Sequence, residues 1–155
     1  MWLPDEIFKS IIQHTPLISI DLIVRNEQGE VLLGKRVNAP AKGYWFVPGG
    51  RVRKNETLDD AFIRLVKEEL GIESGVTRTD AKFLGVFEHF YDDCMFGDDV
   101  STHYVVIAYQ LVIKIKTCIN LYFTQHEKYM WLNDPEILKN NQIIKYVKKY
   151  FNYFY

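Results

Sequence analysis

The chain is 155 residues long, with 48% apolar and 25% charged residues, which is ordinary for a soluble globular protein. A chain of this length predicts a single domain, residues 1–155, that buries about two thirds of its unfolded surface. The net charge of −1 provides no overall attraction for a polyanion, so nucleic acid is excluded as an expected partner.

The first 36 residues predict a helix followed by a β-hairpin. Acidic residues after Pro4 and apolar residues at helical spacing indicate a short amphipathic helix, which Thr15 and the proline after it end. A largely apolar strand follows at 17–24. The turn at 26–29 leads into a second strand at 30–35.

The rest of the chain predicts a mixed sheet between helices. The remaining expected elements are an aromatic strand at 44–47, a helix from Glu56 to about Leu70, strands at 83–90, 102–115 and 129–132, and a helix from Pro135 onward. Gly71 serves as the stop signal of the central helix. Strands on both sides of that helix, with another helix at the end, predict an α/β fold.

The termini and the cysteines indicate no membrane or redox role. No apolar run approaches membrane-spanning length, and the N-terminus lacks the pattern of a signal peptide, so we expect no membrane partner and a cytoplasmic location. Cys94 and Cys118 match no metal or redox motif, which favours two reduced thiols. The aromatic and lysine-rich tail at 143–155 is expected to pack in the core or at a subunit interface rather than on a membrane.

The stretch from Gly50 to Ile72 contains the residues that indicate a functional site. It combines a glycine turn, a lone glutamate, an arginine and two adjacent glutamates at fixed offsets. Residues three and four apart share a helix face, so Leu65, Glu68 and Glu69 are expected to lie together. Two glutamates alone would more simply form a solvated acidic helix end. Joined to the glycines and the arginine in register, they favour a site for Mg²⁺, which prefers oxygen ligands and shares them with substrate phosphates.

Residues next to this stretch are suited to bind phosphate. Gly49 and Gly50 let the backbone approach a metal or phosphate closely. Arg36 and Arg51 flank the same loop, where two guanidinium groups could bind a diphosphate and stabilise it as a leaving group. A surface role would explain either arginine alone, and their common position favours phosphate contact.

The register of Gly50, Glu56, Arg64, Glu68 and Glu69 resembles the Nudix box, the signature of hydrolases of nucleoside diphosphates linked to another group. The resemblance implies the Nudix fold, an α/β/α sandwich with a mixed β-sheet between helices. The family pattern runs Arg-Glu-x-x-Glu-Glu, and this chain has Leu65 in place of the first glutamate. One ligand is therefore missing, and we expect one bound Mg²⁺ rather than several.

Further segments resemble one branch of the family, the GDP-mannose hydrolases that release GDP and free sugar. They cover nearly the whole chain in order, at 19–24, 32–36, 43–51, 89–93, 102–106 and 125–131. That branch also lacks the glutamate after the box arginine. The resemblance implies that water attacks the sugar carbon C1 with inversion, so the base lies on the sugar side, away from the box.

The same resemblance assigns roles by position. His126 is the implied general base, with an ordinary pKa suited to that work near neutral pH. The other implied residues are Gly49, Glu69 and Gln125 for the metal, Arg36 and Arg51 for neutralising the departing GDP, Tyr104 for a hydrogen bond to it, and Asp21 and His89 for contacts to mannose. The role of Glu68 is left open, and GDP-glucose is a further candidate substrate.

Two other functions stay open. A conventional Nudix pyrophosphatase would attack phosphorus, but that chemistry normally uses the carboxylate that Leu65 replaces. A non-catalytic nucleotide-binding Nudix module would be expected to lose the box glutamates, which this chain keeps. The resemblance also implies a homodimer and a place in GDP-sugar supply for polysaccharide biosynthesis. The aromatic strand at 44–47 is a candidate surface for stacking a base.

Overall fold

The computed structural model describes residues 2–114 and 126–152, with side chains from 128 onward in the second range. Its strands are β1 (Leu17–Arg25), β2 (Val31–Arg36), β3 (Trp45–Phe46), β4 (Gly49–Arg51), β5 (Lys82–Tyr91), β6 (Thr102–Val112) and β7 (His126–Leu132). Its helices are α1 (Asp5–His14), α2 (Leu58–Leu70), α3 (Asp134–Lys139) and α4 (Lys145–Lys148), with 3₁₀ turns η1 (Arg78–Asp80) and η2 (Lys149–Phe151).

The strands form one mixed sheet in the order β3-β2-β1-β6-β5, with β4 also paired to β1 and β7 to β2. The long central strands β1 and β6 run parallel, while β5 pairs antiparallel with β6 and β7 antiparallel with β2. Strand β1 is largely buried along its length, as expected for a strand covered on both faces.

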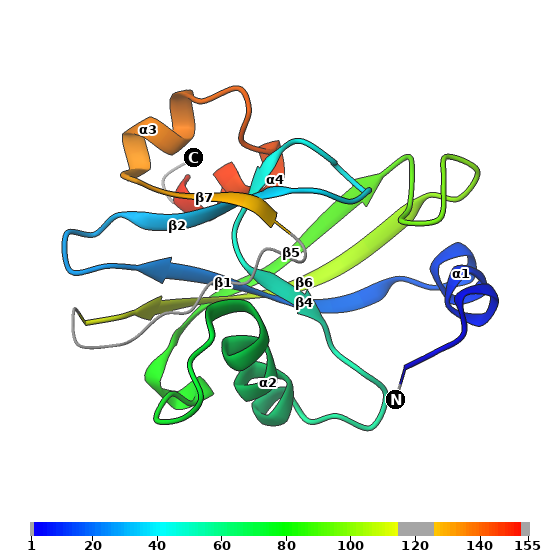
Figure 1. The fold of residues 1–155 in the computed structure, drawn as a ribbon, viewed down its shortest axis with the longest axis horizontal. Helices are drawn as coiled ribbons and strands as arrows, with labels where there is room; N and C mark the ends of the chain where they lie inside the picture. Colours follow the sequence, from blue (N-terminus) through cyan, green and yellow to red (C-terminus); the bar gives the residue numbers. More distant parts are fainter. Residues whose placement is uncertain (1, 115–125, 153–155) are drawn as a thin grey trace.

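Helices cover both faces of the sheet (Figure 1). One apolar cluster lies between the sheet and α2 and includes Phe62, Leu65 and Leu70. A second lies on the opposite face and includes Ile137 from α3 and Tyr150 from η2. The predicted α/β fold with a sheet between helices is therefore confirmed.

The central helix begins at Leu58, two residues after the expected Glu56, and it ends at Leu70 before Gly71, as expected. The Thr57 side chain accepts a hydrogen bond from the backbone N–H of Asp60, and Gly71 ends the helix with a left-handed φ of 68°. A side-chain oxygen at the N-cap satisfies a free backbone N–H, and glycine adopts the left-handed end without a steric penalty. These caps fix the start and the phase of α2, and with them the direction of its polar face.

The structure differs from the expectation at β4 and at the C-terminal helix, and two strand bounds also differ: β6 ends at Val112 and β7 begins at His126. Residues Gly49–Arg51, expected only as a turn, form strand β4, which pairs with β1 so that Gly49 lies opposite Asp21. The C-terminal helix expected from Pro135 ends at Lys139, and a second helix begins at Lys145. Small residues next to a proline indicate a turn by composition, yet here the lack of side chains allows a close backbone pairing.

The aromatic tail packs inside the molecule as far as the structure describes it. Tyr146, Tyr150 and Phe151 are buried, which confirms core packing for these residues. Residues 153–155 lie outside the described range. Within the described parts of the chain, no helix has the length and apolarity needed to cross a membrane.

Candidate active site

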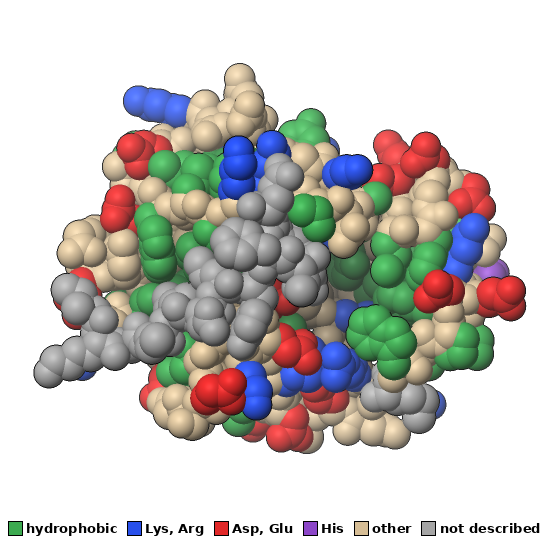
Figure 2. Space-filling view, in the orientation of Figure 1, with side chains coloured by type: hydrophobic (Ala, Val, Ile, Leu, Met, Phe, Trp, Pro, Cys, Tyr) green, Lys and Arg blue, Asp and Glu red, His purple; other side chains and the backbone are tan. Residues whose placement is uncertain are grey.

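A cleft of about 770 Å³ lies where α1, β1, β4, α2, β5 and β6 meet. In Figure 2 it is a hollow with basic side chains at its floor and apolar side chains on the side of α1. All the predicted site residues whose side chains are described line it, namely Asp21, Arg36, Gly49, Arg51, Glu69, His89 and Tyr104. Residues that are far apart in the sequence are thus gathered into one cavity.

The floor of the cleft has no room for side chains on its two glycines. A Cβ on Gly49 would lie 2.4 Å from the backbone oxygen of Ile20 and 2.7 Å from Oδ1 of Asp21. A Cβ on Gly50 would lie 2.6 Å from Cδ2 of Leu65. The pairing of β4 with β1 therefore requires glycine at Gly49, and α2 packs directly beneath Gly50.

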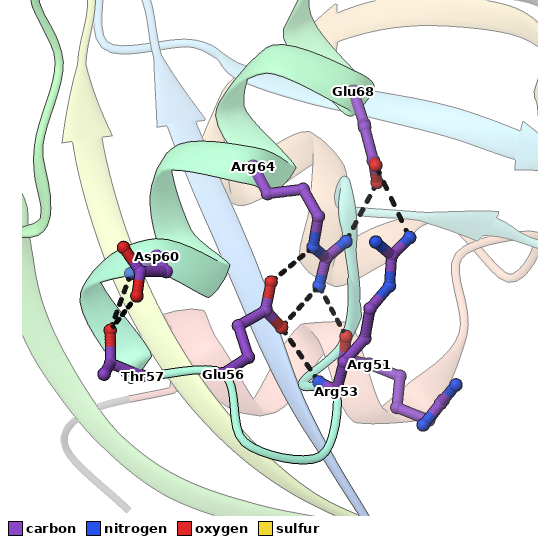
Figure 3. A network of polar contacts seen from close by, with 7 residues as sticks. All are labelled: Arg51, Arg53, Glu56, Thr57, Asp60, Arg64 and Glu68. Atoms are coloured by element: carbon purple, nitrogen blue, oxygen red, sulfur yellow. Dashed lines mark hydrogen bonds and ion pairs between the residues drawn. The ribbon is translucent and has the colours of Figure 1, made fainter. Parts of the chain in front are cut away.

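Arg64 organises the loop that precedes α2 (Figure 3). Its guanidinium donates to both carboxylate oxygens of Glu56, at 2.6 and 3.0 Å, and to the backbone oxygen of Arg51 at 2.9 Å. Glu56 also accepts from the backbone N–H of Arg53 at 2.9 Å. The hydrogen bonds from Arg64 hold the pKa of the Glu56 carboxyl below its ordinary value. The pair thus fixes the loop backbone on which Arg51 is carried.

Glu68, whose role the sequence left open, takes part in the same network. Its carboxylate accepts from Arg64 at 2.9 Å and lies 3.5 Å from the Arg53 guanidinium. Figure 3 shows it at the outer end of the arginine cluster, and its side chain is 45% exposed. Two arginines therefore engage this carboxylate, in contrast to its buried neighbour Glu69.

Leu65 belongs to the core rather than to the polar part of the cleft. It is 1% exposed and packs in the cluster between α2 and the sheet. Its side chain fills the space beneath Gly50. The position at which the box pattern has a carboxylate is therefore apolar and closely packed.

Glu69 is the buried carboxylate of α2. It is 7% exposed, and burial, with Glu68 nearby, raises its pKa to about 7. Arg36 and Arg64 oppose this shift, while Asp21 adds to it. A buried carboxylate among other acidic groups is stabilised in its charged form by a cation. The donor chemistry of this side chain therefore fits a divalent metal ion.

A single glutamate and a glycine carbonyl do not form a complete metal site. Among residues 2–114 and 126–152, no group of three or more His, Cys, Asp or Glu side chains is placed to hold a metal ion. Mg²⁺ keeps several waters and shares substrate phosphates, so few protein ligands suffice for it. The third predicted ligand, Gln125, lies outside the described residues.

The part of the cleft formed by β1 and β5 contains the half-buried Asp21 and the buried His89. Burial raises the pKa of Asp21 to about 6, against the lowering effects of a hydrogen bond from Tyr150 and of the Arg36 charge. Burial, with Lys149 nearby, lowers the pKa of His89 to about 4. The imidazole is therefore neutral at physiological pH, with one nitrogen a donor and the other an acceptor.

The two predicted phosphate-binding arginines are held by aromatic rings. The guanidinium of Arg36 lies 5.4 Å from the ring centre of Phe46, and that of Arg51 lies 4.6 Å from that of Phe8. Such cation–π contacts orient a guanidinium through its face rather than through its N–H groups, and Nε of Arg36 also donates to the backbone oxygen of Asn38 at 3.3 Å. Burial raises the pKa of Tyr104, so its phenol stays protonated and able to donate.

An apolar wall faces these arginines, in a place that the sequence did not indicate. It consists of Trp2, Phe8, Met95 and Phe96, which all line the cleft, and an ion pair of 2.8 Å between Lys9 and Asp99 links α1 to the loop that carries Phe96. In the aromatic strand proposed for base stacking, Trp45 and Phe46 are 9% and 8% exposed, whereas Tyr44 is 44% exposed. Trp45 packs in the core beneath the C-terminal helices.

The predicted general base is located by its backbone. His126 begins β7, opposite Arg36 of β2, next to a register shift between Lys35 and Arg36. Its side chain lies outside the described residues. The start of β7 is thus placed beside a strand end that lines the cleft.

Comparison with known proteins agrees with this geometry. The NUDIX domain family profile matches residues 15–149. The chain belongs to the NUDIX family. The MutT protein from Methanosarcina mazei Go1 has a similar structure, with a TM-score of 0.68, 25% identity, and coverage of 89% of this chain and 92% of that one. The predicted Nudix fold is confirmed, and Nudix hydrolases generally use divalent metals such as Mg²⁺.

The names of similar proteins refer to different functions. The low-salt glycan biosynthesis protein Agl8 of Haloferax volcanii is 46% identical over 111 residues, which cover 72% of this chain and 68% of that protein. An ADP-ribose pyrophosphatase of Methanocaldococcus jannaschii is 40% identical over 57 residues, or 37% of this chain and 33% of that protein. The NUDIX domain of Shewanella oneidensis NrtR, complexed with ADP ribose, shares the fold with a TM-score of 0.63, 15% identity, and coverage of 96% of this chain and 95% of that one.

Proposed function

We propose that this Nudix hydrolase cleaves GDP-mannose, with GDP-glucose as a further candidate, into GDP and free sugar. Water attacks the sugar carbon C1 and inverts it, and GDP departs. The observation that carries the proposal is Leu65, which is 1% exposed and packed beneath Gly50. Attack on phosphorus in this family normally uses a carboxylate at that position, so this cleft is better suited to chemistry on the sugar side.

The box side of the cleft is suited to hold a leaving diphosphate. Arg36 and Arg51 line it together with the phenol of Tyr104. Charge that develops on a departing oxygen is stabilised most by donors already in place in a site shielded from water. Bound Mg²⁺, held by Glu69, the Gly49 carbonyl and Gln125, would supply further positive charge for the diphosphate.

The part of the cleft formed by β1 and β5 is suited to bind a sugar. Asp21 offers a carboxylate, and His89 offers a neutral ring; both line the same cleft as the arginines. Acceptors and donors of this kind recognise hydroxyl groups through hydrogen bonds, and an unmatched hydroxyl would leave a buried group unpaired. His126, at the start of β7 opposite Arg36, would act as the general base that takes a proton from the attacking water.

The remaining expectations are proposals of the same standing. The name of the Haloferax volcanii relative supports a place in sugar supply for glycan or polysaccharide biosynthesis. We propose a homodimer with a cytoplasmic location and with no nucleic acid partner. The apolar wall at α1 is the surface against which the nucleobase would lie.

A conventional pyrophosphatase is the second candidate, and the partial similarity to an ADP-ribose pyrophosphatase favours it. Turnover of GDP-mannose with Mg²⁺ in ¹⁸O-labelled water separates the two. Label in free mannose with unlabelled GDP is the expected result. Label in GMP or mannose phosphate would establish attack on phosphorus and refute the proposal. Binding of nucleotide without any turnover would instead indicate a non-catalytic binding module.

The general base is tested by His126→Gln. Loss of a general base lowers kcat by roughly 10²–10⁴-fold and leaves KM near its original value. His14→Gln is a matched control, since His14 is exposed and is not among the residues that line the cleft. Unchanged turnover in the His126 variant would remove this residue from the mechanism.

A further inference from the structure

Tyr150 lies behind the sugar side of the cleft. It is fully buried in η2, and it is absent from the residues that line the cavity. Its hydroxyl donates to Oδ2 of Asp21 at 2.5 Å and lies 3.1 Å from Nε2 of His89. One phenol oxygen thus joins both residues assigned to the sugar, on strands β1 and β5.

The polarity of these two hydrogen bonds follows from the donors available. The phenol has one hydrogen, which it gives to the carboxylate, so its oxygen accepts from Nε2–H of His89. Nδ1 is then the acceptor nitrogen, and the Tyr91 hydroxyl lies 3.5 Å from it. The lowered pKa of His89 agrees with a neutral ring that has a single N–H.

Packing fixes the phenol in this position. The ring of Tyr150 meets Phe87 edge to face, with ring centres 4.8 Å apart, and the ring of His89 stacks on Tyr146 at 4.6 Å. While Oδ2 of Asp21 is held by Tyr150, its Oδ1 faces Gly49, where an added Cβ would lie 2.7 Å away. One carboxylate oxygen is therefore anchored from behind, and the other is presented at the floor of the cleft.

We propose that Tyr150 is a positioning residue for the sugar subsite, one that orients Asp21 and fixes the tautomer of His89 without itself touching the substrate. This inference rests on the proposed function, because it takes Asp21 and His89 as contacts of the sugar. Side chains held in one orientation recognise hydroxyl groups at a lower entropic cost than mobile ones. The tail of the chain thus sets sugar affinity from outside the cleft.

The matched control is Tyr146. Its hydroxyl donates to the backbone oxygen of Phe90 at 2.6 Å and accepts from the backbone N–H of the same residue at 3.0 Å. Tyr146 and Tyr150 are both buried tyrosines of the tail that pack against His89. Tyr146→Phe removes a buried hydroxyl without breaking a bond to Asp21 or to the ring nitrogens of His89. This variant therefore shows how ligand affinity responds to the loss of a buried tail hydroxyl that bonds only to backbone.

The test compares the Kd of GDP-mannose with that of GDP, by calorimetry with Mg²⁺ and with every protein in a His126→Gln background, the wild type included, because an active enzyme would cleave GDP-mannose during the titration. Tyr150→Phe should weaken GDP-mannose binding roughly tenfold to a hundredfold, because a misoriented Asp21 carboxylate loses its hydrogen bond to the sugar, which is a hydrogen bond to a charged group. GDP binding should stay unchanged. Tyr146→Phe should bind both ligands as the wild type does. Retained affinity in Tyr150→Phe, or equal weakening of GDP, would overturn the positioning role. Failure of the proposed function is seen separately, as ¹⁸O label in GMP or mannose phosphate, or as no turnover at all, in the wild type.

A measurement on the wild type keeps the inference testable if Tyr150→Phe does not fold. The ¹⁵N chemical shifts of His89 report which ring nitrogen is protonated. We expect the Nε2–H tautomer, because the Tyr150 oxygen accepts from that nitrogen. A proton on Nδ1 would contradict the inference.

Discussion

Replacing His89 by phenylalanine should remove a defined part of the acid sensitivity of the fold. The ring is 4% exposed, and burial lowers its pKa from 6.5 to about 4. Between these two values the unfolded chain binds a proton that the folded protein does not. Stability that depends on the neutral ring is therefore full above pH 6.5 and is lost as the pH falls toward 4.

The size of the effect follows from these two values. Between the two pKa values, the unfolding free energy falls by about 1.4 kcal/mol for each pH unit of acidification. Protonation of His89 in the unfolded chain therefore lowers the unfolding free energy of the wild type by about 2 kcal/mol between pH 7 and pH 5. Asp21 and Glu69, whose pKa values burial raises to about 6 and about 7, change stability in the opposite direction. They are present in both proteins, so the difference between wild type and variant isolates His89.

The assay is urea unfolding at pH 7 and pH 5, without substrate. His89→Phe keeps a ring that can stack on Tyr146, and its loss of stability between the two pH values should be about 2 kcal/mol smaller than that of the wild type. An equal loss in wild type and His89→Phe would refute the reasoning.

Three further predictions concern the floor of the cleft and the box. Gly49→Ala should destabilise the fold by several kcal/mol, because the added Cβ meets backbone atoms. Gly50→Ala should destabilise it less, because the added Cβ meets the movable end of the Leu65 side chain. Urea unfolding that ranks the two variants the other way would contradict this. Arg64→Lys should lower the unfolding free energy by about 2–3 kcal/mol, since lysine lacks the planar guanidinium that donates to both carboxylate oxygens of Glu56. A change below about 0.5 kcal/mol would show that the ion pair of Arg64 with Glu56 does not stabilise the fold. EDTA and Glu69→Gln should each abolish turnover, and added Mg²⁺ should restore the turnover of the wild type but not that of the variant. In EDTA the unfolding free energy of Glu69→Gln should be at least that of the wild type, because the variant lacks a buried carboxylate. Turnover that survives EDTA would exclude the metal.

The sequence predicted the parts of the fold that depend on local signals. The stop at Gly71 is determined within a few residues, and the expected helix before it is confirmed, although it begins at Leu58, after the cap at Thr57, rather than at Glu56. Strand β4 was missed because its pairing with β1 is a contact between distant segments. A three-residue strand with two glycines has no apolar alternation to reveal it.

For the site, motif spacing predicted which residues would meet but not how they are held. Asp21, Gly49 and Tyr104 line one cleft as expected, although their roles stay predictions. The contribution of Tyr150 could not be read from the chain, because a tyrosine among other tail aromatics carries no sign of a partner 129 residues away. The apolar wall was missed for the same reason, since Phe8 and Phe96 meet only through the tertiary packing of α1.

The parallel pairing of β1 with β6 has a consequence for the order in which the protein is made. Ser19 pairs with Val106, so the central strand is synthesised early and leaves the ribosome long before its neighbour. Until then, an apolar strand has one open edge, which is a hazard for aggregation during synthesis. Asp21 lies on the first strand and Tyr104 on the second, so no species that lacks β6 contains the complete cleft. Ligand binding should therefore appear only after β6 has paired with β1.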